Sequence, residues 1–149
     1  AAILTTGTLG NVDDDTAPWL RFTTVSATSG LSAGCHTATT LFRTTWYPEA
    51  YFKTKLPQGT GHAIFVHGFG SVYPFNDDNK KGHMAYWRYN YRNGDRTWKT
   101  VINNNSPTGD IFETSIPIVT GIPIELGVSI TPTAVNFYYN KILIISATV

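Results

Sequence analysis

Charged residues are scarce in this chain, at 14% of 149 residues, against about 25% in an average globular domain. The eleven basic and ten acidic residues nearly cancel, which leaves a formal net charge of +1. Binding to a phosphate backbone depends on clustered lysines and arginines, and here the basic residues are scattered along the sequence. We therefore expect no nucleic acid partner.

Cysteine and long apolar runs are nearly absent as well. Cys35 is the single cysteine, so no disulfide can form within the chain. Stability must then come from a hydrophobic core or from association with other chains. No apolar stretch is long enough to cross a bilayer, so we expect no membrane span.

Strong helix formers are few, whereas β-branched and aromatic residues are plentiful, which favours strands. Short strand patterns separated by turn residues predict an all-β, antiparallel two-sheet sandwich or jelly roll of roughly ten strands. The dipeptide Asn93-Gly94 between two aromatic segments predicts a hairpin. The expected strands are Trp19–Val25, Thr37–Thr44, Glu49–Leu56, His62–Gly68, His83–Arg92, Trp98–Ile102, Ile111–Val119, Ile124–Ile130, Ala134–Asn140 and Ile142–Ala147.

Alternation of apolar and polar residues supports these assignments. In Ile124–Ile130 the apolar residues occupy every second position, and Glu125, Gly127 and Ser129 lie on the other face. We expect one domain over residues 1–149, with residues 1–18 as a turn-rich lead-in that fits the junction with a stalk. The run from Ile142 to Ile145 is apolar on both faces, which predicts burial by two layers of the same domain or by a neighbouring subunit.

No pattern in the chain indicates catalysis, and we expect a protein without enzymatic activity, cofactor or metal. Two carboxylates at the spacing of a glycosidase are not found on one strand, and no nucleophile elbow occurs. His62 and His67 are five residues apart, which places them on opposite faces of a strand. The acidic runs at residues 13–15 and 76–79 do not have the spacing of a calcium loop, so we interpret them as solvated turns.

Aromatic residues are the feature above background, with thirteen of them from Trp46 to Trp98. Rings beside planar polar groups are suited to stacking on sugars and to protein contacts. We expect the face with Trp87, Tyr89 and Tyr91 to lie in the core, and the opposite face and the preceding loop, Ser71–Gly82, to contact a ligand. The candidate ligand-binding residues are Tyr73, Phe75, Asn76, Asp77, Asp78, Arg88, Asn90 and Arg92, and the candidate oligomer interface is Ile142, Leu143, Ile144 and Ile145.

The segments His62–Gly70, Ala85–Asn105 and Pro117–Ile144 follow an order that resembles concanavalin-like jelly-roll modules of phage tail fibres and related viral appendages. In the last segment Lys141 stands where the family usually has glycine. The N-terminal third resembles the joint between a trimeric stalk and a distal knob of a tail needle or fibre. Such knobs adopt jelly-roll or tumour-necrosis-factor-like sandwiches.

The resemblance implies a viral or phage attachment knob, located on the virion tail or otherwise extracellular. It would bind a host cell-surface receptor or glycan and self-associate as a homotrimer. A monomeric or dimeric carbohydrate-binding, lectin-like module stays open as the alternative, because a charge-poor surface suits glycan contact as well as packing against copies of the same chain.

Overall fold

The computed structural model describes residues 2–5, 7–14, 17–24, 33–36, 47–56, 64–70, 82–90, 94–104 and 109–149, the strands before residue 47 as backbone only. The chain divides into two compact units, residues 1–42 and 43–149. All regular structure in the described residues is β-strand. None of these residues belongs to a helix that could span a membrane. The single domain expected over residues 1–149 stays a prediction.

The first unit holds four strands in two antiparallel pairs. Strand β1 (Ala2–Thr5) pairs with β4 (Ala33–His36), and β2 (Gly7–Asp14) pairs with β3 (Ala17–Thr24). The expected strand from Trp19 corresponds to β3. The segment interpreted as a turn-rich lead-in, residues 1–18, contains β1, all of β2 and the first two residues of β3.

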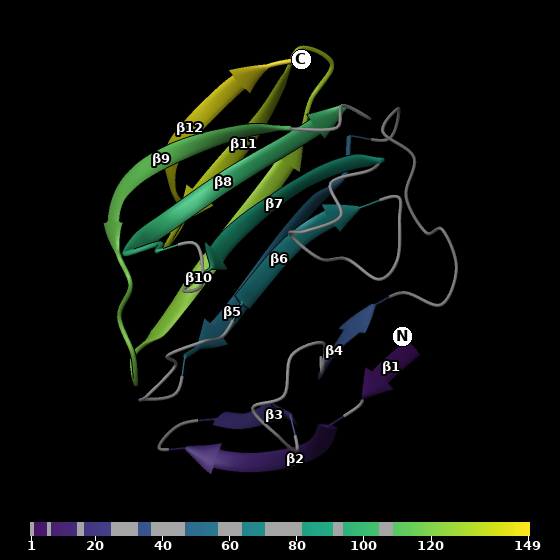
Figure 1. Cartoon of the computed structure of the whole chain (residues 1–149), viewed down its shortest axis with the longest axis vertical. Coiled ribbons are helices and arrows are strands. Elements are labelled where there is room, and N and C mark those ends of the chain that lie inside the picture. Colours follow the sequence, from purple (N-terminus) through teal and green to yellow (C-terminus); the bar gives the residue numbers. More distant parts are fainter. Residues whose placement is uncertain are drawn as a thin grey trace. The chain divides into compact units, whose positions relative to one another are not determined.

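The second unit contains two antiparallel sheets of four strands, which Figure 1 shows one behind the other. One sheet has the order β12-β11-β10-β5. Its strands are β5 (Glu49–Lys55), β10 (Pro123–Ile130), β11 (Ala134–Tyr139) and β12 (Ile142–Thr148). Among the described strands, β5 and β12 are therefore the two edges of this sheet.

The other sheet has the order β6-β7-β8-β9. Its strands are β6 (Ile64–Gly70), β7 (His83–Asn90), β8 (Thr97–Asn104) and β9 (Asp110–Pro117). Strands β7 and β8 form the expected hairpin, and Gly94 has a positive φ of 81°. The backbone N–H of Asp95 donates a 3.1 Å hydrogen bond to the carbonyl oxygen of Asn90 between these two strands.

The core lies between these two sheets and is built by alternate residues of their central strands. Buried side chains from β7 and β8 meet buried side chains from β10 and β11. Trp87 is central, since its ring packs edge-to-face on Trp98 at 6.4 Å and on Phe137 at 5.8 Å between ring centroids. The indole N–H of Trp87 also donates a hydrogen bond of 2.9 Å to the carbonyl oxygen of Gly127 in the opposite sheet. The β-sandwich prediction is confirmed.

Eight strands make up the sandwich, where roughly ten were expected. The remaining described strands belong to the first unit, and the expected strand Thr37–Thr44 lies outside the described residues. Strands β6 to β9 follow one another in one sheet and β10 to β12 in the other, where β5 pairs with β10. The jelly-roll strand order stays a prediction.

Strand β7 is buried on both of its faces. Trp87 and Tyr89 face the sandwich core as expected, whereas Tyr91 lies outside the described residues. On the other face Met84 and Tyr86 form a smaller buried cluster with Val101. A face that alternation assigns as polar or outward is thus not necessarily exposed.

His67 brings a titratable group into the space between the sheets. Its ring lies 5.8 Å from that of Phe52 and 6.5 Å from that of Trp98, measured between centroids. The Nε2 atom is buried and has no hydrogen-bond partner. Because burial disfavours the charged imidazolium, the pKa of His67 falls from its usual 6.5 to about 4.

We expect His67 to make stability depend on pH in mildly acidic solution. Between about pH 6.5 and pH 4 the unfolded chain binds a proton at this position and the folded chain does not, so stability falls as the pH falls. The loss at pH 4.5 amounts to about 2 to 3 kcal/mol of unfolding free energy. Urea titrations at pH 7 and pH 4.5 should show this loss in the parent and its removal in His67→Leu.

Thr100→Val is the matched control. The Thr100 hydroxyl is another buried polar atom without a partner, but it does not titrate in this range. The substitution should change stability equally at both pH values. An unchanged pH dependence in His67→Leu would show that the histidine is not the acid-sensitive group.

Candidate binding surface

The structure describes two of the eight predicted ligand-binding residues, Arg88 and Asn90. Both are on β7, and both are buried, with 3% and 1% of their surface exposed. Their role in ligand contact stays a prediction. Tyr73, Phe75, Asn76, Asp77, Asp78 and Arg92 lie outside the described residues.

Arg88 and Asn90 converge on Asp95, which precedes β8. The guanidinium of Arg88 donates to both carboxylate oxygens, from Nε to Oδ2 at 3.2 Å and from its terminal nitrogen to Oδ1 at 3.3 Å. The backbone N–H of Asn90 donates to Oδ2 at 2.8 Å. A two-point guanidinium–carboxylate pair fixes orientation as well as charge. This cluster therefore ties the end of β7 to the start of β8.

Lys99 extends the cluster towards the surface. Its ammonium lies 3.1 Å from Oδ1 of Asp95 and 2.6 Å from Oε1 of Glu113 on β9. The hydrogen bond to Glu113, with further contributions from Asp95, raises the pKa of Lys99 above its usual value against the opposing effect of burial. Three neighbouring strands are thus joined by alternating charges, with the best-buried carboxylate at Asp95.

We expect Asp95→Asn to be strongly destabilising, because it leaves the buried Arg88 guanidinium without its counter-charge. The cost of breaking one side of a buried ion pair is about 3 to 5 kcal/mol. Glu113→Gln is the control, since the Glu113 carboxylate is exposed and should contribute about 1 kcal/mol or less. Urea denaturation at pH 7 measures both. Equal effects of the two substitutions would mean that burial does not govern this network.

A second group of side chains lies on the outer face of the sheet β12-β11-β10-β5. Cross-strand partners share a face, so the register arranges them in rows. The middle row runs from Tyr51 through Gly127 and Tyr138 to Leu143. Tyr51 is 44% exposed, and Leu143 is 52% exposed. This face therefore presents a tyrosine ring to solvent at the edge strand β5.

Gly127 allows the Tyr51 ring to lie across the sheet. A Cβ atom at position 127 would stand 2.4 Å from Cε1 and 2.6 Å from Cδ1 of Tyr51, which is closer than any real contact. Glycine inside a strand often marks such a close approach. The rings of Tyr51 and Tyr138 lie with centroids 5.9 Å apart and their planes tilted by 48°. Together these residues form an aromatic floor over the middle of the sheet.

Polar groups border this floor on one side. Asn136 donates from its amide to Ser129 Oγ at 3.3 Å, and Ser129 Oγ contacts the Tyr138 hydroxyl at 3.5 Å. In the same row Glu49 pairs across the strands with Ser129. A hydrogen bond to the Glu49 carboxylate holds the proton on the Tyr51 hydroxyl and raises the pKa of Tyr51 to about 12. Tyr51 is therefore neutral at physiological pH.

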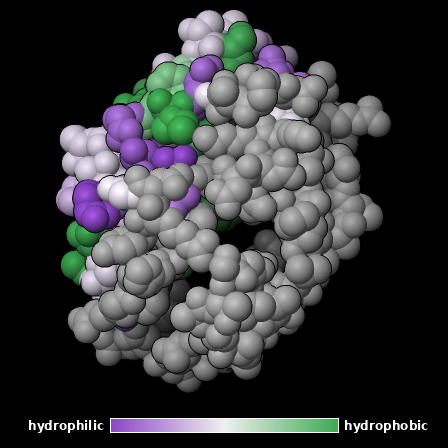
Figure 2. Space-filling view, viewed as in Figure 1, coloured by the Kyte–Doolittle hydropathy of each residue, from purple (hydrophilic) through white to green (hydrophobic). Residues whose placement is uncertain are grey.

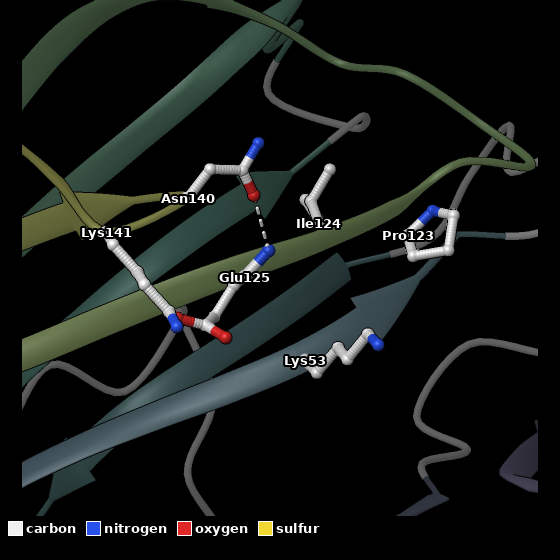
Figure 3. Close-up of a pocket in the computed structure, with 6 residues that line it drawn as sticks. All are labelled: Lys53, Pro123, Ile124, Glu125, Asn140 and Lys141. Atoms are coloured by element: carbon white, nitrogen blue, oxygen red, sulfur yellow. Dashed lines mark hydrogen bonds between the residues drawn. The ribbon is translucent and has the colours of Figure 1, made fainter. Parts of the chain in front are cut away.

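A shallow depression of about 240 Å³ adjoins the other side of the floor. Its lining residues are Lys53, Pro123, Ile124, Glu125, Asn140 and Lys141. Figure 3 shows the Glu125 side chain reaching towards Lys141, with Lys53 on the neighbouring strand β5. The Asn140 side-chain oxygen accepts a 2.9 Å hydrogen bond from the backbone N–H of Glu125. Lys53 and Glu125 are cross-strand partners in the third row of the same outer face, and with Lys141 their charges alternate in sign.

The turn between β11 and β12 places Lys141 at this depression. Asn140 and Lys141 have positive φ values of 49° and 68°, as a two-residue hairpin turn of type I′ requires. Asparagine tolerates this conformation, whereas lysine is strained in it. Glycine would fit here without strain.

We expect Lys141→Gly to stabilise the chain by about 1 kcal/mol through relief of this strain. The midpoint of urea denaturation measures the effect. Asn140→Gly is the control, because it removes the hydrogen bond to Glu125 and should gain less or lose stability. A loss of stability in Lys141→Gly would show that the lysine side chain contributes more than its backbone costs.

The predicted interface residues lie on β12, and three of them are exposed. Ile142 is 66% exposed, Leu143 is 52% exposed and Ile144 is 36% exposed, whereas Ile145 packs against the core. The register shifts between Phe137 and Tyr138, so Ile145 pairs with the buried Phe137 but Leu143 pairs with the outward Tyr138. This bulge turns Leu143 and Ile145 to opposite faces, although simple alternation places them on one.

Hydrophobic and hydrophilic side chains are intermixed on the described part of the face in Figure 2. The exposed fractions show which apolar side chains of β12 reach the surface. Of the large hydrophobic side chains described, Ile142 has the greatest exposed fraction. Burial of this strand by two layers of its own unit, one of the two arrangements expected, is not found among the described residues.

Tyr51 and Gly127 are the surface residues that the sequence interpretation did not select. Tyr51 belongs to the aromatic group already noted, and alternation in Glu49–Lys55 places it beside Glu49 and Lys53 on one face. Gly127 interrupts a strand whose other outward residues are polar. Both residues can be noticed in the local sequence. The contact between Tyr51 on β5 and Gly127 on β10 cannot be predicted from it.

Among the described residues, no three histidine, cysteine, aspartate or glutamate side chains gather as they would around a metal ion. Comparison with protein families, curated proteins and solved structures found no match to this chain.

Proposed function

We propose that this chain is a non-enzymatic attachment knob, of the kind found at the tip of a phage or viral tail fibre or needle. It binds a host cell surface and associates with two further copies of itself. The observation that supports this proposal best is β12, a sheet edge with exposed apolar side chains. The jelly-roll or tumour-necrosis-factor-like strand order of such knobs is implied by the sequence resemblance alone.

Strand β12 has a bulge in its pairing with β11, but it carries no charged residue and no proline. Natural edge strands are blunted by charged residues or proline, because their unpaired backbone groups otherwise attract other strands. The segment from Ile142 to Val149 contains neither. Ile142 and Leu143 each expose more than half of their surface. Other copies of this chain are the partner that would cover this strand in every molecule.

The environment of the described carboxylates favours binding over acid–base chemistry. Asp95 is held by Arg88, and Glu113 by Lys99. A lectin-like carbohydrate-binding module, monomeric or dimeric, is the second candidate, and the aromatic floor around Tyr51 favours it.

Light scattering coupled to gel filtration at micromolar concentration tests the proposal. We expect a mass of three times the 16.4 kDa chain. The double substitution Ile142→Asp with Leu143→Asp should give a folded monomer, because it puts two charges on the edge strand. Ile111→Asp is the control, since Ile111 is also exposed, at 39%, on an edge strand of the other sheet.

A monomeric parent would overturn self-association and leave the lectin-like module. A trimeric double variant would locate the interface on another surface. Near-ultraviolet circular dichroism of each variant shows whether the aromatic core is intact, so that loss of mass is not confused with unfolding.

A further inference from the structure

We propose that the outer face of the sheet β12-β11-β10-β5 binds a neutral glycan, with one hexopyranose ring stacked on Tyr51. This site is not among the ligand-binding residues predicted from the sequence. It rests on the proposed function only in treating the chain as a binding protein. The observation behind it is an exposed tyrosine ring laid across a strand glycine, between two rows of polar side chains.

The position of Tyr51 suits stacking on a sugar. The aliphatic C–H groups of a pyranose carry partial positive charge, and the face of an aromatic ring is negative. Gly127 has no side chain to separate the ring from the sheet, so the ring lies across the strand. The close approach of Gly127 and the tilted ring of Tyr138 limit the positions open to the Tyr51 ring. A ring held in this way loses little entropy when a ligand stacks on it.

The polar side chains on the two sides of the aromatic floor supply groups that can form hydrogen bonds with sugar hydroxyls. Tyr138 accepts a contact from Ser129 and keeps its own hydroxyl proton as a donor. Asn136 presents an amide, which offers both a donor and an acceptor. On the other side the depression of about 240 Å³ between Lys53 and Lys141 can take a second sugar residue. The face is therefore long enough for more than one ring.

The charge of this face favours a neutral ligand. Lys53, Lys55 and Lys141 lie on this face together with Glu49 and Glu125, so charges of both signs are interspersed on it. An anionic glycan would gain from the lysines and lose against the glutamates. Hydroxyl groups, which both donate and accept, match such a mixed surface better than a carboxylate does.

Position in the sheet lets this site coexist with the proposed trimer. Tyr51 is on β5 and the association strand is β12, at the opposite edge of the sheet. The two functions can therefore be separated by substitution. A substitution at Tyr51 leaves the β12 edge intact, and Ile142 does not belong to the row of Tyr51.

Saturation-transfer NMR and calorimetric titration of the full chain test the proposal. The probes are tetrasaccharides of β-1,4-linked glucose, mannose and galactose, and trigalacturonic acid as the anionic counterpart. We expect at least one neutral tetrasaccharide to bind. Tyr51→Ala should weaken that binding at least about tenfold, whereas Tyr51→Phe keeps the ring and should stay within about threefold. Ile111→Ala, an equivalent truncation on the other sheet, should leave binding unchanged.

Three results would overturn the proposal. They are no binding of any neutral probe, binding of trigalacturonic acid alone, and binding that Tyr51→Ala leaves unchanged. Each variant is first checked by its melting temperature, so that a folded protein is compared. Ile142→Asp separates this proposal from the attachment-knob trimer: it should reduce the mass in solution and leave the glycan affinity per chain unchanged.

Discussion

The hydrogen bond from the Trp87 indole to the carbonyl of Gly127 is the contact on which the core and the outer surface both depend. It joins the two sheets directly, at 2.9 Å, in the most buried part of the sandwich. An indole N–H buried without a partner would be costly, so this bond fixes where the sheets face each other. On the other side of the same residue lies the Tyr51 ring. Position 127 is therefore constrained from both faces of its strand.

The strands of the sandwich could be predicted from the sequence because their signal is local. Alternation in the segment from Ile124 to Ile130 shows which residues face inward, and the structure buries Ile124, Leu126 and Val128. The environment of β12 could not be predicted in the same way. Its apolar residues indicate that something covers it, but edge position is a property of the whole sheet. The bulge opposite Phe137 and Tyr138 depends on pairing with β11. It places Leu143 and Ile145 on opposite faces, where simple alternation would place them on one face.

The same distinction explains the candidate sites. Alternation correctly separates Arg88 and Asn90 from Trp87 on β7, yet both polar residues are buried against Asp95. A polar residue on the face away from a core is exposed only if nothing else covers that face. Their partner, Asp95, precedes β8. Its pairing with Arg88 and Asn90 depends on the folded structure and cannot be predicted from residue types alone. Tyr51 was not selected from the sequence, because the orientation of its ring across the sheet depends on Gly127 in another strand.

Lys141 links the turn, the depression and the edge strand. Its positive φ disfavours lysine, and strain of this kind is retained where the side chain contributes something else. The side chain lines the depression beside Glu125, one residue before the apolar strand begins. The lysine therefore places a positive charge at the depression of the ligand face, directly before the strand proposed for association.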